Sequence, residues 1–434
     1  MNYRGYILAI TLILLTFLKC KQPSDIDQPP NVILILVDDM GFSDIGAYGS
    51  EIETPNIDRL AFEGVRFTNA YNTSKCFPSR ACILTGLYSQ QIGYHKTFRL
   101  KMKNAITLGE LFKTAGYTTL WSGKHHSIEN PITRGFDHYS GLLDGASNHF
   151  NPGVKRTGEG QPAQKGWMKS SPSTYRNWVV EGEIFNPYTP ESRDFYTTDV
   201  FTDYALNWIN EVDKKKPFFL YLAYTAPHDP LMAWPEDIEK YKDRYNLGYK
   251  KIRQNRFKKQ KELGILPENA QLSNAAYNNW GSLSVEDRAD ETRAMEVYAA
   301  MIDRLDQNIG KILSILENQK KLENTLIVFA SDNGGVNERD QINATFSRQL
   351  SETLIARVSS TYQEIRSASG GNSNDIRKNF SVSPSIAWNF SSNVNLSLSY
   401  KYRHQKDSQV GTDVDSNAIM LTLNYDWDGL QISR

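Results

Sequence analysis

Short unbroken apolar runs alternate with longer amphipathic segments along most of the chain. The runs are residues 31–37 (NVILILV), 117–123 (YTTLWSG), 217–224 (PFFLYLAY) and 325–331 (TLIVFAS). Apolar runs of this length are typical of strands buried on both faces of a parallel sheet. The amphipathic segments are residues 55–63, 108–115, 199–212 and 286–316, and we expect them to form helices. The alternation predicts an α/β domain with a mixed, mostly parallel sheet flanked by helices.

A different pattern occupies residues 343–434, where apolar and polar positions alternate with period two. The alternating stretches are residues 354–362, 382–390, 394–402 and 417–427. Antiparallel strands of about 10 residues with aromatic ends resemble the last strands of a bacterial outer-membrane β-barrel protein. Four strands are too few for a closed barrel, which needs at least about 8. The alternative is an antiparallel sheet that faces solvent.

The first 30 residues predict an export segment. After Arg4, the apolar run 6–18 is shorter than the roughly 20 residues of a membrane-spanning helix and is typical of a signal peptide, which we place at residues 1–20. Residues 21–30 would then form a leader or tether. Cys20 stands where bacterial lipoproteins carry the lipidated cysteine, although Lys19 departs from the usual small residue. The chain is therefore expected to be exported in a bacterium, either periplasmic or anchored to a membrane by lipid.

The composition argues against two classes of protein, nucleic-acid-binding proteins and disulfide-rich scaffolds. The 49 Lys and Arg residues balance 49 Asp and Glu residues, so the chain lacks the basic excess of a nucleic-acid-binding protein. Three cysteines in 434 residues are too few for a disulfide scaffold. We therefore expect no nucleic-acid partner, and each cysteine needs its own explanation.

Polar clusters follow all four predicted parallel strands. They are Asp38-Asp39, Lys124 with His126, His228, and Asp332-Asn333. Because the carboxyl ends of parallel strands share one edge of the sheet, these residues are expected to form one site. The carboxylate and amide oxygens suit a hard cation such as Ca²⁺ or Mg²⁺. The histidines and the lysine would supply positive charge and proton transfer, which favours an anionic substrate.

The segment around Cys76 identifies the chemistry. Lys75-Cys76-Phe77-Pro78-Ser79-Arg80-Ala81, continued by CILTG, resembles the sulfatase signature. Pro78 fits the first turn of a helix, so Cys76 is expected at a helix N-terminus, where an anion is favoured. Asp38-Asp39 precedes this segment and the other strand-end clusters come after it, in the order found in the sulfatase family. The resemblance covers about residues 31–337 and implies an alkaline-phosphatase-like fold.

The resemblance also implies roles for individual residues. Cys76 would be oxidised to formylglycine by a maturation enzyme, and the hydrate of that group would attack a sulfate ester of an aryl compound or a glycan. Arg80 would hold the hydrate, whereas Lys124, His126 and His228 would surround the sulfate. Ca²⁺, with Mg²⁺ as the alternative ion, would be bound by Asp38, Asp39, Asp332, Asn333 and the modified Cys76.

The chain departs from the sulfatase pattern after Gly335. Sulfatases continue into a glycine-rich loop with a second sulfate-contacting lysine, but the lysines beyond Lys321 stand at 378, 401 and 406, outside such a context. We therefore predict a truncated catalytic domain at 31–337, a junction at 338–342 and an antiparallel β segment at 343–434. The alternatives are a divergent sulfatase subdomain after the junction, a phosphodiesterase or phosphonate hydrolase of the same fold, and a catalytically inert fusion.

Overall fold

The computed structural model describes most of the chain as two compact units. The described residues are 29–73, 75–94, 97, 99–160, 162, 176–273, 280–335, 339–351, 353–366, 376–390, 394–407 and 412–425. The first unit combines residues up to Asp38 with Asn72–Thr225 and Gln307–Asp332, and the second combines Asp39–Tyr71, Ala226–Asp306 and the residues from Asn333 onward. The predicted signal peptide, Cys20 and all but the last two residues of the leader lie outside the described residues.

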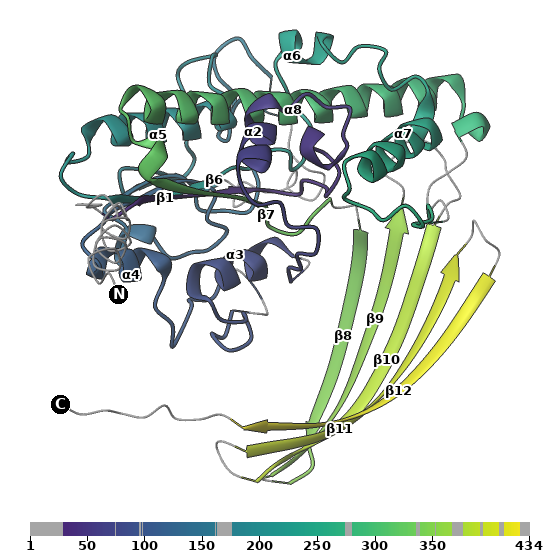
Figure 1. The fold of residues 1–434 in the computed structure, drawn as a ribbon. Helices are drawn as coiled ribbons and strands as arrows, with labels where there is room; N and C mark the ends of the chain where they lie inside the picture. Colours follow the sequence, from purple (N-terminus) through teal and green to yellow (C-terminus); the bar gives the residue numbers. More distant parts are fainter. Residues whose placement is uncertain are drawn as a thin grey trace, which may run out of the picture. The chain divides into compact units, whose positions relative to one another are not determined.

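A seven-stranded sheet forms the centre of the first unit (Figure 1), in the order β5-β4-β3-β2-β6-β1-β7. Its strands are β1 (Asn31–Val37), β2 (Thr118–Gly123), β3 (His138–Leu142), β4 (Trp178–Val180), β5 (Glu183–Phe185), β6 (Phe218–Ala223) and β7 (Thr325–Ser331). Strands β3, β2, β6, β1 and β7 are parallel to their neighbours, and β4 and β5 extend the β3 edge antiparallel. The predicted α/β class with a mostly parallel sheet is confirmed.

The central strands are buried because helices and aromatic side chains cover them. The helices of this unit are α3 (Cys76–Thr85), α4 (Leu108–Thr114), α5 (Thr197–Glu211) and the last turns of α8 (Val285–Asn318), which continues from the second unit. Trp121 and Tyr221 lie in the core with ring centroids 4.6 Å apart. Thr107 and Glu110 form a reciprocal capping box that starts α4. Packing thus fixes the strand ends from which the polar clusters project.

The second unit contains further helical elements. They are α2 (Pro55–Glu63), α6 (Pro235–Glu239), α7 (Gly248–Glu262) and the first part of α8. The carboxylate of Asp306 accepts hydrogen bonds from the backbone N–H groups of Asn56 and Ile57 at 3.2 and 2.8 Å, so it caps the N-terminus of α2. Single 3-10 turns complete the helical elements of the described chain: η1 (Gly46–Tyr48), η2 (Pro131–Arg134), η5 (Trp280–Ser282) and η6 (Leu322–Asn324).

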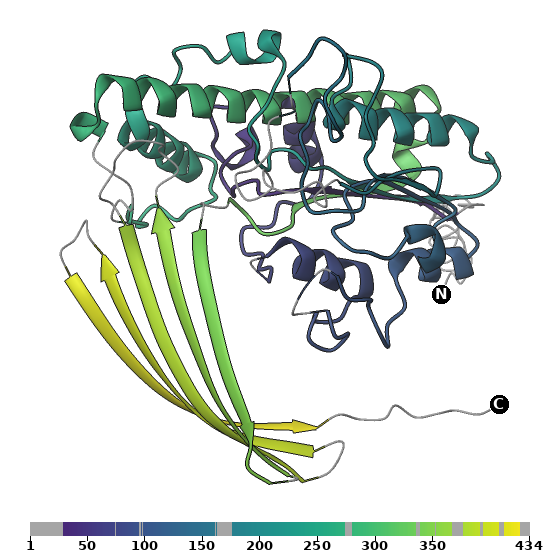
Figure 2. The same ribbon diagram turned by 180° about the vertical axis from the view of Figure 1, so that it is seen from behind.

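A five-stranded antiparallel sheet, in the order β12-β11-β10-β9-β8, follows in the second unit. Its strands are β8 (Arg339–Gln349), β9 (Leu354–Arg366), β10 (Ile376–Asn389), β11 (Val394–Asp407) and β12 (Thr412–Tyr425). Figure 2 shows these long green-to-yellow strands curving together. The four predicted strands correspond to β9–β12, whereas β8 was not predicted and begins inside the expected junction. Among the described residues, no helix combines the length and apolar character that crossing a membrane requires.

Leu220 provides a test of the sheet core. It is fully buried on β6, in register between Leu120 of β2 and Ile33 of β1. We expect Leu220→Ala to lower the free energy of unfolding by about 2–5 kcal/mol, because it removes buried methyl groups and leaves a cavity. Urea titration measures this change. Leu111→Ala on α4 is the matched control, since Leu111 is 51% exposed; equal losses in the two variants would contradict the fold.

Asp306 gives a pH-dependent prediction. Burial raises its pKa to about 6, despite the hydrogen bonds from α2 that favour the charged form. An acid whose pKa is higher in the folded than in the unfolded state contributes less stability as pH rises between the two values. Relative to the uncharged Asp306→Asn variant, the wild type should therefore lose about 2–3 kcal/mol of unfolding free energy between pH 4 and pH 7. A difference that stays constant across this range would contradict the assignment.

Candidate active site

Four charged side chains meet at the strand ends of the first unit. Asp38 follows β1, Lys124 follows β2, Asp332 follows β7, and Arg80 reaches them from α3. Arg80 Nε donates to Asp332 Oδ2 at 2.8 Å, and its Nη2 lies 3.5 Å from Asp38 Oδ1. The ammonium group of Lys124 pairs with Asp38 Oδ2. All four side chains are at most 2% exposed, so their charges are balanced by one another and not by water.

Burial and the neighbouring charges set the protonation of this cluster. Burial and the Asp38 carboxylate raise the pKa of Asp332 to about 6, although Arg80 and Lys124 oppose the shift. Burial alone would lower the pKa of Arg80, but Asp332 and Asp38 outweigh it and raise that pKa, so the guanidinium stays charged. Arg80 also donates from Nη1 to the Lys124 carbonyl oxygen at 3.2 Å. The arginine therefore holds the ends of β1, β2 and β7 in one place.

Cys76 is the first residue of α3, as its sequence context predicted. It forms no disulfide with another described residue, and its side chain is half-buried. The unpaired N–H groups of a helix N-terminus favour an anion there. Arg80 lies four residues later, and side chains four residues apart share one face of a helix. One helix thus carries the predicted nucleophile and the cation predicted to hold it.

His126 is held by packing and by an unusual backbone. Its φ is 65°, and its ring lies edge-on to Phe77 with centroids 5.8 Å apart. A Cβ atom added at Gly145 would lie 2.4 Å from His126 Nε2, so only glycine leaves room for the ring. Neighbouring His125 turns instead against Trp121, with ring centroids 4.5 Å apart, and burial lowers its pKa to about 3. His125 is therefore a neutral core residue.

The second unit holds the other three predicted site residues together. Asn333 Nδ2 donates to Asp39 Oδ1 at 2.6 Å, and His228 Nε2 lies 3.5 Å from Asp39 Oδ2. His228 Nδ1 lies 2.6 Å from the carbonyl oxygen of Asp229 and 3.1 Å from its Oδ1. These contacts orient the ring, so that Nε2 faces the site. The sequence alone assigned no role to Asp229, although this residue adjoins His228.

Each of the two clusters offers oxygen donors that suit a hard cation. Buried Oδ1 atoms of Asp38 and Asn333 accept no hydrogen bond from the described residues, so each keeps lone pairs for a ligand. Asp39 follows Asp38 and Asn333 follows Asp332, so two peptide bonds join the clusters. Oxygen donors from carboxylates and one amide are the ligands that Ca²⁺ prefers. The residues present therefore suit the metal that the sequence predicted.

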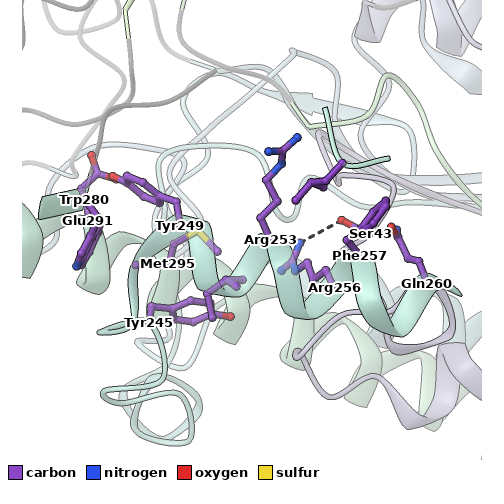
Figure 3. A pocket seen from close by; sticks show the side chains of 13 residues that line it. Ser43, Tyr245, Tyr249, Arg253, Arg256, Phe257, Gln260, Trp280, Glu291 and Met295 are labelled. Atoms are coloured by element: carbon purple, nitrogen blue, oxygen red, sulfur yellow. Dashed lines mark hydrogen bonds between the residues drawn. The ribbon is translucent and has the colours of Figure 1, made fainter. Parts of the chain in front are cut away.

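A pocket of about 410 Å³ lies elsewhere in the second unit (Figure 3). Tyr245, Tyr249, Phe257 and Trp280 contribute aromatic rings to it, and Tyr249 packs edge-on to Trp280 with centroids 5.0 Å apart. Arg256 on its wall donates to Ser43 Oγ at 3.3 Å. None of the lining residues belongs to the predicted active site.

The role of Gly145 can be tested without any substrate. We expect Gly145→Ala to displace the His126 ring and to lower the free energy of unfolding by about 1–3 kcal/mol, because the added methyl group overlaps the imidazole. NMR of the imidazole resonances together with urea titration measures both effects. Gly160→Ala is the matched control, since a Cβ atom there meets open space. An unchanged His126 resonance in Gly145→Ala would contradict the close approach of the His126 ring to Gly145.

The chain is similar in sequence to a known family and to several of its members. The sulfatase family model matches residues 30–386, which extends past the predicted limit of 337. An arylsulfatase of Klebsiella aerogenes is 33% identical over 351 residues, covering 77% of this chain and 71% of the relative. An uncharacterized sulfatase of Schizosaccharomyces pombe is 36% identical over 334 residues, covering 71% of this chain and 58% of the relative.

Solved structures show a similar fold. The crystal structure of Ps i-CgsB is 31% identical and has a TM-score of 0.50, with 71% of this chain and 59% of that chain covered. The chain thus spans less than two thirds of this structure and of the Schizosaccharomyces relative. The resemblance first indicated by the Cys76 segment is confirmed at the level of the family. On the family match and the similarity to the Klebsiella arylsulfatase, the chain belongs to the sulfatase family.

Proposed function

We propose that this chain hydrolyses sulfate esters of aryl compounds or glycans, using a formylglycine formed from Cys76 and a bound Ca²⁺. The observation that carries the proposal is the buried cluster around Arg80. This residue lies one turn after Cys76 and pairs with Asp38 and Asp332, two predicted metal ligands. We propose that a formylglycine-generating maturation enzyme converts Cys76, the half-buried first residue of α3.

The chain's own residues account for binding and proton transfer. When present, the formylglycine hydrate supplies the attacking oxygen, and Ca²⁺ stabilises charge on the sulfuryl oxygens. Lys124, His126 and Arg80 supply positive charge for the sulfate. His228 donates a proton from Nε2 to the leaving alcohol, because Asp229 holds its Nδ1 side. Asp332 accepts the proton of the attacking hydroxyl, and His126 assists the release of sulfate.

Similar proteins support this range of substrates. An arylsulfatase is among the relatives, as is a canine N-acetylgalactosamine-6-sulfatase that is 30% identical over 330 residues. The BT4656 protein was solved with its substrate D-glucosamine-2-N,6-O-disulfate; at 24% identity it bears on the fold alone. We therefore include both aryl sulfates and sulfated glycans in the proposed substrate class.

Hydrolysis of a chromogenic aryl sulfate tests the proposal. The full chain, co-expressed with a maturation enzyme, should cleave 4-nitrophenyl sulfate faster than 4-nitrophenyl phosphate, lose activity on chelation and regain it with Ca²⁺. Cys76→Ala should lower kcat at least about a thousandfold, because it removes the nucleophile. Cys82→Ala, in the same helix, is the matched control and should leave kcat unchanged.

Other outcomes would contradict the proposal in distinct ways. Preferential cleavage of the aryl phosphate would instead favour a phosphodiesterase or phosphonate hydrolase of the same fold. Full activity in Cys76→Ala would exclude the formylglycine mechanism. No hydrolysis of either ester by chain that carries formylglycine would favour the catalytically inert fusion.

A further inference from the structure

The five-stranded sheet β8–β12 presents one apolar face that the described chain leaves uncovered. The side chains concerned alternate along β10, β11 and β12 and are about half exposed or more: Ile386 (49%), Trp388 (49%), Leu398 (52%), Ile419 (76%) and Leu421 (69%), together with Phe390 (52%) after β10. A sheet that faces water on one side normally covers its apolar face with another layer. We refer to this surface as the apolar face.

Strand register makes the apolar face continuous. Ile386 of β10 pairs with Ala356 of β9 and with Leu398 of β11, and Leu398 pairs in turn with Leu421 of β12. Trp388 starts a second row, since it pairs with Leu354 and Leu396. Residues directly opposite each other on neighbouring strands project to the same side of the sheet. The apolar side chains therefore form unbroken rows across four strands.

The opposite face is mostly polar, although Met420 of β12 lies on it, paired with Ser399. Ser385 of β10 pairs directly with Ser399 of β11, one position away from the pair Ile386 and Leu398. Ser381 and Ser383 continue this side along β10, and Lys401 and Arg403 continue it along β11. Between Phe380 and Phe390 and between Val394 and Tyr402 the single charged residue is Lys401, on the polar side, so the apolar face carries no charge within these two stretches. This distribution of charge matches a sheet with hydrocarbon on one side and water on the other.

The dimensions of the apolar face match a bilayer. Phe380 and Phe390 stand ten residues apart on this face, a distance of about 33 Å along a strand. With the roughly 40° tilt of membrane strands, the rise is about 25 Å, the height of a lipid-facing apolar band. Aromatic residues mark both ends. Trp388 stacks on Phe390 with centroids 4.7 Å apart, and Tyr402 follows Tyr400 near the other end. Aromatic girdles of this kind flank the apolar band of membrane sheets.

We propose that the apolar face, as formed by β9–β12, is embedded in the hydrocarbon of a lipid bilayer; on β8 the position next to Ala356 in the Ile386 row is Arg348, so that strand lies at the margin of the face. Within the described sheet, β8 and β12 each pair on one side only. Backbone groups must be paired inside a bilayer, so these two edges would pair with strands of further copies of the chain. Two copies would supply ten strands, above the minimum of about 8 for a closed membrane sheet. The inference is independent of the proposed hydrolysis.

Vesicle flotation with matched variants tests the inference. The full chain is mixed with vesicles of dilauroylphosphatidylcholine, washed with alkaline carbonate and floated through a sucrose gradient; we expect the wild type to float. The double variant Ile386→Arg with Leu398→Arg should lower the ratio of bound to free protein at least about thirtyfold, because both charges would enter the lipid-facing band. The control pair Ser385→Arg with Ser399→Arg adds the same charge to the other face and should change the ratio far less.

A second readout separates insertion from loss of folding. Lipids brominated along the acyl chain should quench the fluorescence of the bound wild type, and Trp388→Phe should remove part of that quenching. Circular dichroism of each variant before lipid is added checks that the β content is retained. Wild type that stays in the aqueous fraction, or equal effects of the two arginine pairs, would overturn the proposal. So would a lipid-free dimer that Ile386→Arg with Leu398→Arg abolishes, because a second copy would then cover the face.

Discussion

The pairing of Arg80 with Asp38 and Asp332 is the interaction on which the candidate active site depends. Three parallel strands end in charged residues, and without a buried cation two carboxylates would repel each other at that edge. Arg80 and Lys124 balance them, at distances of 2.8 and 3.5 Å for the two arginine contacts. Leaving one partner of a buried ion pair uncompensated costs about 3–5 kcal/mol. The same contacts that hold the strand ends thus prepare a charged, water-excluded site next to Cys76.

Much of the fold could be predicted from the sequence, because its central strands are buried on both faces. Such strands are unbroken apolar runs, and β1 has the predicted bounds of 31–37. The edge strand β7 also has its predicted bounds of 325–331, although Leu326 and Val328 on it are exposed. The three-residue strands β4 and β5 were not predicted, since so short a stretch carries no periodicity. Strand β8 was missed for a related reason: Arg339, Asp340 and Gln341 interrupt its apolar pattern at the start.

The candidate site residues could be selected from the sequence because strand ends and the Cys76 segment carry a chemical signature. The residues that position them, Gly145 and Asp229, could not be predicted in this way. Gly145 matters only because the His126 ring lies against it, and a glycine in an unremarkable segment gives no signal of that contact. Asp229 orients His228 from the next position in the chain, yet an aspartate in a turn has many other uses. Contacts made in three dimensions, rather than residue type, assign these two roles.

The chemical state of Cys76 decides whether the site works as the account requires. Mass spectrometry of the peptide that contains Cys76, taken from full chain co-expressed with a formylglycine-generating enzyme, measures it directly. We expect the mass of formylglycine at position 76 and an unmodified thiol at Cys82. An unmodified thiol at Cys76 under the same conditions would contradict it.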